Sequence, residues 1–257
     1  MRNSLKEVRK LHQKKFRVLD NQFIIEGIKN NEILFKKRSG WVNSIYYCPE
    51  VLEKSIINYI ESLEFQTEQI TKDELEYIST TKTPQGVIST ALLPENYFIS
   101  DLREFSNNII FFDRIREPGN LGTLLRTLAW FGFFDVVLNN CVELFSPKVI
   151  RSSAGAIFNN FKFHIYSGEL KEIIEEFKIQ KFKIISSTSQ TGENLYEFSF
   201  PEKSVIIFGN EPSGVSEDLL NYSDYRLKIP GQESIESLNV GVAGGIILSL
   251  LYKQRKV

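Results

Sequence analysis

Residues 109–131, IIFFDRIREPGNLGTLLRTLAWF, contain the pattern that decides the fold. They begin with four consecutive apolar residues, Ile109 to Phe112, which is typical of a parallel strand buried on both faces. A polar loop follows, and leucines at helical spacing from Leu121 then predict a helix to about Phe131. A buried strand that leads through a loop into a helix is the repeating unit of a parallel sheet flanked by helices.

The same alternation continues toward the C-terminus. Further strands are predicted at 136–138, 161–166, 182–186, 204–208 and 225–229, and further helices at 147–158, 169–178, 216–221 and 239–252. The pattern therefore predicts an α/β fold whose C-terminal domain, residues 108–257, is built on a parallel sheet. Ligands of such sheets bind beyond the carboxyl ends of the strands, so we expect the functional residues in the loops that lead into helices.

A smaller α/β domain is predicted ahead of this one, over residues 1–92, with 93–107 as a linker that lacks sustained periodicity. Its predicted elements are an amphipathic helix at 4–19, strands at 23–25 and 44–48, a helix at 51–62, and a turn at 83–88 that leads into a strand. The apolar stripe of the first helix comprises Leu5, Val8, His12, Phe16 and Leu19.

The composition narrows the class of protein. With 257 residues, of which 42% are hydrophobic and 25% charged, the chain is an ordinary globular protein that can build a core without disulfides or a structural metal. Its two cysteines and two histidines lie in unrelated segments and predict no metal site. The apolar runs are shorter than the roughly 20 residues of a membrane span. We expect a soluble, cytoplasmic protein without metal or membrane contact.

Positive charge is concentrated near the N-terminus. Residues 1–40 carry 11 Lys and Arg residues against 4 acidic ones, although the whole chain has a net charge of −1. The predicted N-terminal helix gathers five of these cations on one side: Lys6, Arg9, Lys10, Lys14 and Arg17. Such a patch suits an anionic partner, although a solvated helix face would show the same pattern.

The first of three notable loops follows the strand at 109–112. It contains Gly119, Asn120 and Gly122, and Arg126 projects from the border of the apolar stripe of the following helix. A guanidinium at that place can face a cleft while its aliphatic stem packs. Taken alone, Asn120 is an ordinary helix cap and the two glycines are turn residues.

The second loop, 205–216, leads from an apolar strand through Gly209, Glu211 and Gly214 to a helix that begins near Ser216. It has neither the Gly-Lys-Ser/Thr of a P-loop nor the Gly-x-Gly-x-x-Gly of a dinucleotide site. Acidic residues at the start of the helix favour a neutral or cationic ligand over a phosphate. A plain connection between strand and helix would have the same pattern.

The third loop, 229–240, also leads from a strand end into a helix, which Ser237 or Asn239 could cap. The helix at 239–252 is apolar on every side, so all of its faces must be covered. One face can meet the sheet. The other would meet a second subunit in a homodimer, unless the helix is fully buried within one chain.

Together the three loops resemble the motifs of the SpoU (TrmH-like) family of RNA ribose methyltransferases, in the SPOUT superfamily. The resemblance lies in residues 120–126, 208–216, 229–230 and 236–240, in their order and spacing, and in the intervening segment 151–156. The N-terminal part is similar to the ribosomal-protein-like substrate-binding domain often fused to this core, at 15–17, 23–27 and 83–87. One departure is Gly231, where family members often carry Met.

The resemblance implies S-adenosylmethionine-dependent transfer of a methyl group to a ribose 2′-hydroxyl in RNA, with ribosomal RNA favoured over transfer RNA. It also implies a homodimer and a trefoil knot in the C-terminal domain. The implied catalytic residues are Asn120, Arg126, Glu211, Ser237 and Asn239, and the implied cofactor-binding residues are Gly209, Asn210, Gly214, Ile229 and Leu238. Arg126 would either take the proton of the hydroxyl or stabilise the developing oxyanion.

Two other functions fit parts of the pattern. A catalytically silent RNA-binding or ribosome-assembly protein could use the same scaffold, although the motif residues are all present. A nucleotide-dependent oxidoreductase could use a doubly wound sheet, but its glycine fingerprint is missing. Binding of S-adenosylmethionine would distinguish a methyltransferase from the silent RNA-binding protein and from the oxidoreductase.

Overall fold

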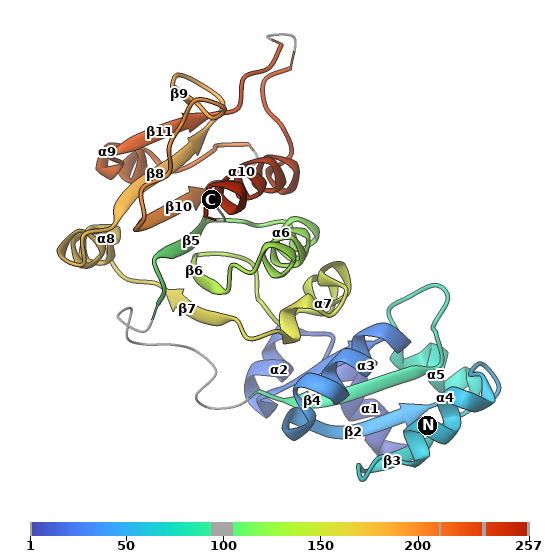
Figure 1. Ribbon diagram of the computed structural model, residues 1–257. Helices are drawn as coiled ribbons and strands as arrows, with labels where there is room; N and C mark the ends of the chain where they lie inside the picture. The colour runs from blue at the N-terminus through green and yellow to red at the C-terminus, as the bar shows by residue number, and fades with distance from the viewer. Residues whose placement is uncertain (1, 94–104, 211, 233–234, 256–257) are drawn as a thin grey trace. The chain divides into compact units, whose positions relative to one another are not determined.

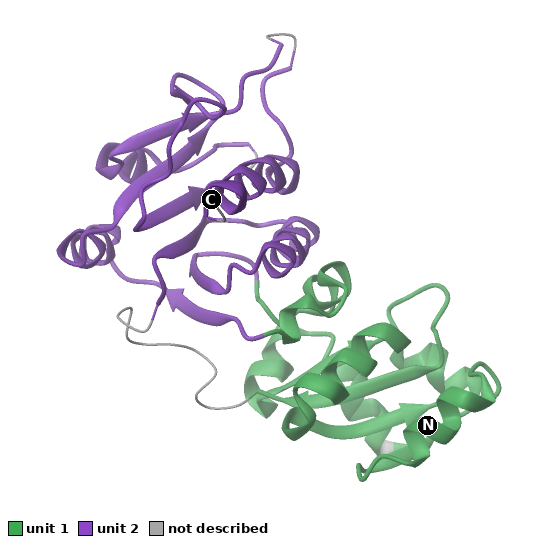
Figure 2. Cartoon of the chain, in the orientation of Figure 1, with its two compact units in different colours: residues 1–95, 143–159 green, residues 96–142, 160–257 purple. Residues whose placement is uncertain are grey.

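The computed structural model describes residues 2–93, 105–210, 212–232 and 235–255. The chain forms two compact units, shown in Figure 2. Unit 1 combines Met1–Glu95 with Glu143–Asn159, and unit 2 combines Asn96–Val142 with Asn160–Val257. Each unit thus combines two separate stretches of the sequence. The division into domains at 1–92 and 108–257, with a linker at 93–107, stays a prediction.

Unit 2 is built on a seven-stranded sheet with the order β7-β6-β5-β10-β8-β11-β9, in which every neighbouring pair is parallel. Its strands are β5 (Asn108–Asp113), β6 (Asp135–Asn139), β7 (Lys162–Tyr166), β8 (Lys183–Thr188), β9 (Glu193–Asn194), β10 (Ser204–Phe208) and β11 (Tyr225–Lys228). The predicted α/β fold with a C-terminal parallel sheet is confirmed. Because the strands are parallel, their carboxyl ends share one edge.

Helices cover both faces of this sheet (Figure 1). Helices α8 (Leu170–Ile179) and α9 (Glu217–Tyr222) lie on one face, and α6 (Pro118–Phe131) and α10 (Val240–Arg255) lie on the other. The core under α8 and α9 contains the following buried side chains: Ile109, Phe111, Ile173, Ile174, Phe177, Val205, Ile207 and Leu219. Alternate residues of β5 and β10 point to the opposite face, where the rings of Phe112 and Phe208 lie 6.2 Å apart.

Unit 1 contains a mixed sheet with the order β1-β4-β2-β3. The strands are β1 (Gln22–Glu26), β2 (Val42–Tyr47), β3 (Thr67–Gln69) and β4 (Val87–Leu92). The helices are α1 (Asn3–Lys10), α2 (Lys14–Asp20), α3 (Ile28–Lys37), α4 (Lys54–Glu61), α5 (Lys72–Ile78) and α7 (Pro147–Ser153). One core joins α1 and α5 to the sheet, with Leu5, Val8, Leu75, Ile78 and Ile24 among its buried residues.

The segment 143–159 completes the core of unit 1. The ring of Phe23 on β1 lies 4.7 Å from the ring of Phe145 and 6.5 Å from that of Phe158. Phe158 is fully buried. Arg17 forms a buried ion pair with Glu143, with 2.6 Å from Nε to Oε1 and 2.5 Å from Nη2 to Oε2. Residues more than 120 positions apart are thus parts of one core.

The N-terminal helix predicted at 4–19 is two helices, α1 and α2. Gln13 adopts an extended conformation (φ −98°, ψ 131°) and starts α2, so the helical phase is reset there. Leu19, predicted in the apolar stripe, is 76% exposed as a result. Arg17, predicted on the basic face, is instead buried against Glu143. The predictions for Leu19 and Arg17 are therefore wrong.

Other differences from the predicted elements have local causes. The helix predicted at 147–158 ends at Ser153, because Ala154 (φ 50°) and Gly155 (φ 81°) both have left-handed backbones. Helices α3 and α5 were not predicted, although Thr71 and Glu74 form a capping box at the start of α5. None of the helices within the described residues is long and apolar enough to cross a membrane.

Phe158→Ala tests whether the segment 143–159 belongs to the core of unit 1. Removing this fully buried ring should lower the free energy of unfolding by about 3 to 5 kcal/mol, as expected for a large core side chain. Denaturant-induced unfolding followed by circular dichroism measures the change. Ile179→Ala, at an 80% exposed position, is the control and should change little. Equal stability of the two variants would contradict this packing.

Candidate functional site

A fully buried carboxylate, that of Asp113, lies at the carboxyl end of β5. Its Oδ1 accepts a hydrogen bond from Nδ2 of Asn139 at 2.8 Å, and its Oδ2 accepts one from the backbone N–H of Ser216 at 2.9 Å. Arg114 Nε lies 3.2 Å from the same Oδ2. Asp113 therefore connects the ends of β5 and β6 to the start of α9, which joins the first and second loops.

The second loop closes tightly after β10. The N–H of Asn210 donates to the carbonyl of Gly214 at 3.1 Å, and the N–H of Gly214 donates to the carbonyl of Asn210 at 2.8 Å. A Cβ atom on Gly209 would lie 2.1 Å from the backbone of Gly214, so only glycine fits at 209. Glu211, predicted as catalytic, lies outside the described residues.

The third loop contacts the first through two asparagines. Asn239 Nδ2 donates to Asn120 Oδ1 at 3.1 Å, and Asn239 Oδ1 accepts from the N–H of Gly241 at 2.9 Å. Asn239 thus caps α10 and holds Asn120 with the other end of its amide. Asn120 lies inside the first turn of α6, which is capped by Glu117, so the alternative that Asn120 is an ordinary cap is wrong.

The remaining predicted residues occupy neighbouring positions on these segments. Arg126 is exposed on α6, about 9 Å along the helix axis from Asn120 at 1.5 Å per residue. Ser237 is exposed two residues before Asn239, and Leu238 is 45% exposed. Ile229 is half-buried and directly follows β11. The structure thus shows a direct hydrogen bond between Asn120 and Asn239. Arg126 and Ser237 are located only by their positions in the sequence, on α6 and just before α10.

Sequence reasoning assigned no role to Asp113 or Asn139. The available signal was an acidic residue at the end of a continuous apolar strand, a position where burial forces a charged side chain to find partners. That Asn139 and Ser216 supply those partners was not visible, because they lie 26 and 103 residues away in the sequence.

Cys141 lies just beyond β6, beside the polar residues at this edge of the sheet. Its Sγ donates to the carbonyl of Phe112 at 3.3 Å, and burial raises the pKa of the thiol to about 12. A thiol with this pKa stays protonated at neutral pH and is a poor nucleophile. The thiol of Cys141 therefore contributes no nucleophile at this edge. Within the described residues, no cluster of His, Cys, Asp and Glu could hold a metal ion.

The loops offer mainly uncharged hydrogen-bonding groups to a ligand. Asn120, Asn210 and Asn239 supply amides, and Gly214, at the end of the turn, is exposed. The Oγ of Ser216 is buried and has no hydrogen-bond partner in the described part of the structure. A ligand or a water molecule can satisfy such an atom.

Comparisons with known proteins identify the family of the chain. Residues 107–249 match the model of the SpoU rRNA Methylase family, and residues 2–89 match the MRM3-like substrate binding domain. The chain is 30% identical over 247 residues to the 23S rRNA (guanosine(2553)-2′-O)-methyltransferase RlmP of Bacillus subtilis, covering 95% of this chain and 94% of the relative.

Solved structures show the same fold over nearly the whole chain. An RNA 2′-O ribose methyltransferase matches with a TM-score of 0.86 and 25% identity, covering 99% of this chain and 97% of that one. The SpoU methyltransferase AviRb of Streptomyces viridochromogenes, in complex with the cofactor AdoMet, matches with a TM-score of 0.85 and 20% identity over 100% and 99% of the two chains. The second likeness bears on the fold alone.

Gly209→Ala tests the close approach in the second loop. The added Cβ would meet the backbone of Gly214 at 2.1 Å, so the loop must open and the thermal midpoint of unfolding should fall by several degrees. Differential scanning calorimetry measures the shift. Gly231→Ala is the matched control, because a Cβ at 231 meets nothing within 4 Å. Similar midpoints for the two variants would show that the loop is not tightly closed.

Proposed function

The chain belongs to the SpoU rRNA methylase family and is an S-adenosylmethionine-dependent RNA 2′-O-methyltransferase, and we propose that its substrate is ribosomal RNA. The observation that best supports the proposed active site is the 3.1 Å hydrogen bond between Asn239 and Asn120, which joins the first and third motifs. The relative from Bacillus subtilis acts on 23S rRNA according to its name, and it spans the whole of this chain's architecture. These two points favour ribosomal RNA over transfer RNA.

The loops fit S-adenosylmethionine. When bound, this cofactor supplies a methyl group that is already activated by a sulfonium centre. We assign its binding to the backbone of Gly209, Asn210 and Gly214 in the closed turn, and to Ile229 and Leu238 in the third motif. Uncharged groups suit a zwitterionic ligand with a cationic sulfur, and the orphaned Oγ of Ser216 lies next to this turn in the sequence.

The protein's part in the reaction is to position the ribose and to stabilise charge on its oxygen. Asn120 and Asn239 hold each other and fix the geometry of the first and third loops. Because a guanidinium keeps its proton in proteins, the role proposed for Arg126 is electrostatic. It orients the RNA and stabilises the negative charge that develops on the 2′-oxygen as the new C–O bond forms, the methyl–sulfur bond breaks and the hydroxyl proton passes to water. Ser237 and Glu211 are proposed to complete the hydrogen bonds around the ribose.

The chain is proposed to act as a cytoplasmic homodimer. Support comes from apolar side chains exposed on the two paired helices, since Trp130 of α6 is 84% exposed and Val242 of α10 is 53% exposed. A second subunit that packs against these helices would cover both side chains. The trefoil knot implied by the resemblance stays a prediction.

RNA binding by the N-terminal helices is proposed for Lys6, Arg9, Lys10 and Lys14. Arg9 lies over the ring of Tyr77 at 4.2 Å, and Lys10 is paired with Glu7 at 2.8 Å. Arg17 is left out of this set because its guanidinium is buried against Glu143. The match of residues 2–89 to a substrate binding domain supports this role.

Arg126→Ala should abolish detectable methyl transfer, because no other cation of α6 can replace its guanidinium beside the ribose. Affinity for S-adenosylmethionine and the molecular mass in solution should stay unchanged, since the side chain is exposed and Arg126 lies outside the proposed cofactor loops. Transfer of a radiolabelled methyl group to RNA, calorimetric titration and light scattering measure the three quantities. Turnover like that of the wild type would remove Arg126 from the mechanism.

The proposed substrate class is tested by mapping ribose methylation in the host. Deletion of the gene should remove one 2′-O-methyl group from ribosomal RNA and leave transfer RNA unchanged, as read by mass spectrometry of both RNA fractions. Purified protein should restore that methyl group on RNA from the deletion strain. Loss of a methyl group from transfer RNA alone would overturn the proposal for ribosomal RNA while leaving the family activity intact.

A further inference from the structure

Unit 1 contains a cavity of about 260 Å³ that lies away from the three motif loops along the chain. Its wall is formed by the turn from β1 into α3, the loop that precedes β4, and α7. The charged residues on this wall are Lys29, Arg151 and the carboxylate Glu26, and the polar ones are Asn30, Thr81, Thr83 and Gln85. We propose that this cavity binds one unstacked nucleotide of the RNA substrate, an inference that rests on the proposed function.

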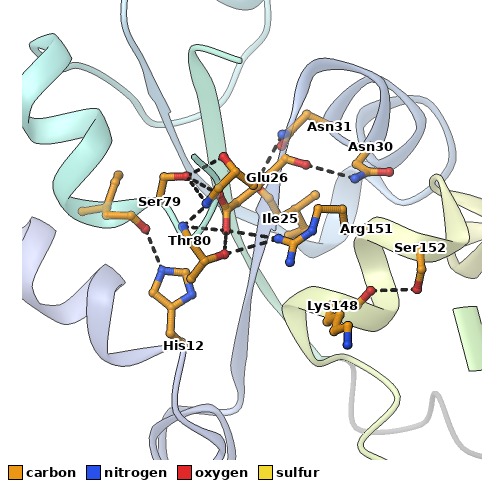
Figure 3. A network of polar contacts seen from close by, with 12 residues as sticks. His12, Ile25, Glu26, Asn30, Asn31, Ser79, Thr80, Lys148, Arg151 and Ser152 are labelled. Carbon is orange, nitrogen blue, oxygen red and sulfur yellow. Dashed lines mark hydrogen bonds and ion pairs between the residues drawn. The ribbon is translucent and has the colours of Figure 1, made fainter. Parts of the chain in front are cut away.

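A buried carboxylate next to the cavity positions its arginine (Figure 3). The side chain of Glu26 is 6% exposed and accepts hydrogen bonds from Ser79 Oγ at 2.5 Å, Thr80 Oγ1 at 2.6 Å and the N–H of Thr80 at 3.2 Å. Arg151 Nη1 lies 3.8 Å from Glu26 Oε1 and 3.3 Å from Thr80 Oγ1. Neutral donors therefore stabilise the carboxylate, and the guanidinium is held at its edge with 41% of the side chain exposed.

The start of α3 provides a second attraction for negative charge. Gly27 has a φ of 94° and turns the chain from β1 into this ten-residue helix. Gln85 Oε1 accepts the N–H of Ile28 at 3.0 Å, and Asn30 Nδ2 donates to the carbonyl of Glu26 at 3.0 Å, so the loop and the helix start are fixed to each other. Lys29 is exposed in the first turn, where the helix dipole also favours anions.

The lining suits a nucleotide better than a bare anion. Lys29, Arg151 and the helix start offer positive charge for a phosphate, and Arg151 offsets the carboxylate of Glu26. Val87 and Ile88 line the cavity with only 2% and 1% of their surface exposed, so they offer a base a small apolar contact. Amide and hydroxyl groups can meet the hydrogen-bonding edge of that base. The cavity of about 260 Å³ is smaller than the roughly 300 to 1,000 Å³ of pockets for drug-sized ligands, so it can enclose the base of one nucleotide but not a duplex. Sequence-specific RNA recognition usually targets bases that are splayed out in this way.

Both sequence modules contribute to this cavity. Arg151 belongs to the segment matched by the SpoU methylase model, at 107–249, while Lys29 and Gln85 belong to the substrate-binding match at 2–89. Arg151 also lies in the segment 151–156, which resembles the family but to which the sequence assigns no function. Selection of RNA in unit 1 would thus depend on a residue that the methylase part supplies.

Binding of RNA by single variants of the full-length protein tests this proposal. The probe is an unmodified transcript of 23S ribosomal RNA, with affinity measured by filter binding. Lys29→Ala and Arg151→Ala should each weaken binding about tenfold, the effect of losing one charged contact to nucleic acid. Lys36→Ala on the same helix is the matched control, because Lys36 is exposed and paired with Glu32, and its affinity should stay within twofold of wild type. Affinities of Lys29→Ala and Arg151→Ala equal to that of the control would overturn the proposal.

Two further measurements fix the site and the source of the nucleotide. A transcript containing 4-thiouridine should photocrosslink to peptides covering residues 27–36 or 81–88, and crosslinks found only elsewhere would count against the cavity. Free mononucleotides should not displace the transcript, since an isolated nucleotide lacks the rest of the RNA contacts. If mononucleotides bind tightly and Lys29→Ala loses only that binding, the cavity serves a small molecule and the proposal is wrong.

The proposal and the proposed function can fail separately. Titration of S-adenosylmethionine should give the same affinity for wild type, Lys29→Ala and Arg151→Ala, because none of these residues belongs to the motif loops. A wild-type protein that methylates no RNA would contradict the function, whereas normal methylation with unchanged RNA affinity in both variants would contradict only the cavity. Lys29 is exposed, so its variant tests the site without disturbing the core.

Discussion

The carboxylate of Asp113 is the constraint on which the arrangement of the site depends. A charge that is fully buried is costly unless hydrogen bonds satisfy it, so the structure must bring donors to the end of β5. Asn139 and the N–H of Ser216 meet this need. The start of α9 is thereby fixed beside β5, and the closed turn between β10 and α9 is fixed with it. Loss of Asn139 would leave Oδ1 of a buried carboxylate without this donor, although Arg114 would still pair with Oδ2.

Asp113 connects the first loop to the second, and the pair Asn120 and Asn239 connects the first loop to the third. Asn239 uses its carbonyl oxygen to cap α10 and its amide nitrogen to hold Asn120, so a single side chain ends one loop and orders another. The cap and the contact depend on each other, because the amide must be oriented for both. The third motif is therefore coupled to the first through a hydrogen-bonded pair, while the second motif is coupled to the first through a buried charge.

The elements that could be predicted from the sequence are those whose signal is local. The strand at 204–208 has the predicted bounds, because a continuous apolar run between polar residues leaves little choice. The predicted helix at 4–19 failed at Gln13, where an extended backbone resets the phase without a proline or glycine to mark it. Arg17 failed for a different reason: its partner Glu143 lies 126 residues away, and nothing in the neighbourhood of Arg17 indicates burial.

The site shows the same division between local and distant signals. The loops were found from their residues and spacing, and the contact between Asn120 and Asn239 agrees with the expectation that they meet. The role of Asp113 and the cavity beside Glu26 were not found, because each depends on residues that come together only in three dimensions. The order of the strands, with β10 inserted between β5 and β8, likewise follows from long-range pairing.

The placement of residues 143–159 has a consequence for how this protein can be divided. Phe145 and Phe158 pack against the rings of Phe23 and Trp41, which belong to the N-terminal half of the sequence. A truncated chain that begins near residue 108 would keep every motif but expose both rings to water, and it should aggregate. The substrate-binding half would in turn lack part of its core if expressed alone. We therefore expect that neither half folds as a stable unit without the other, because residues 143–159 belong to the core of unit 1.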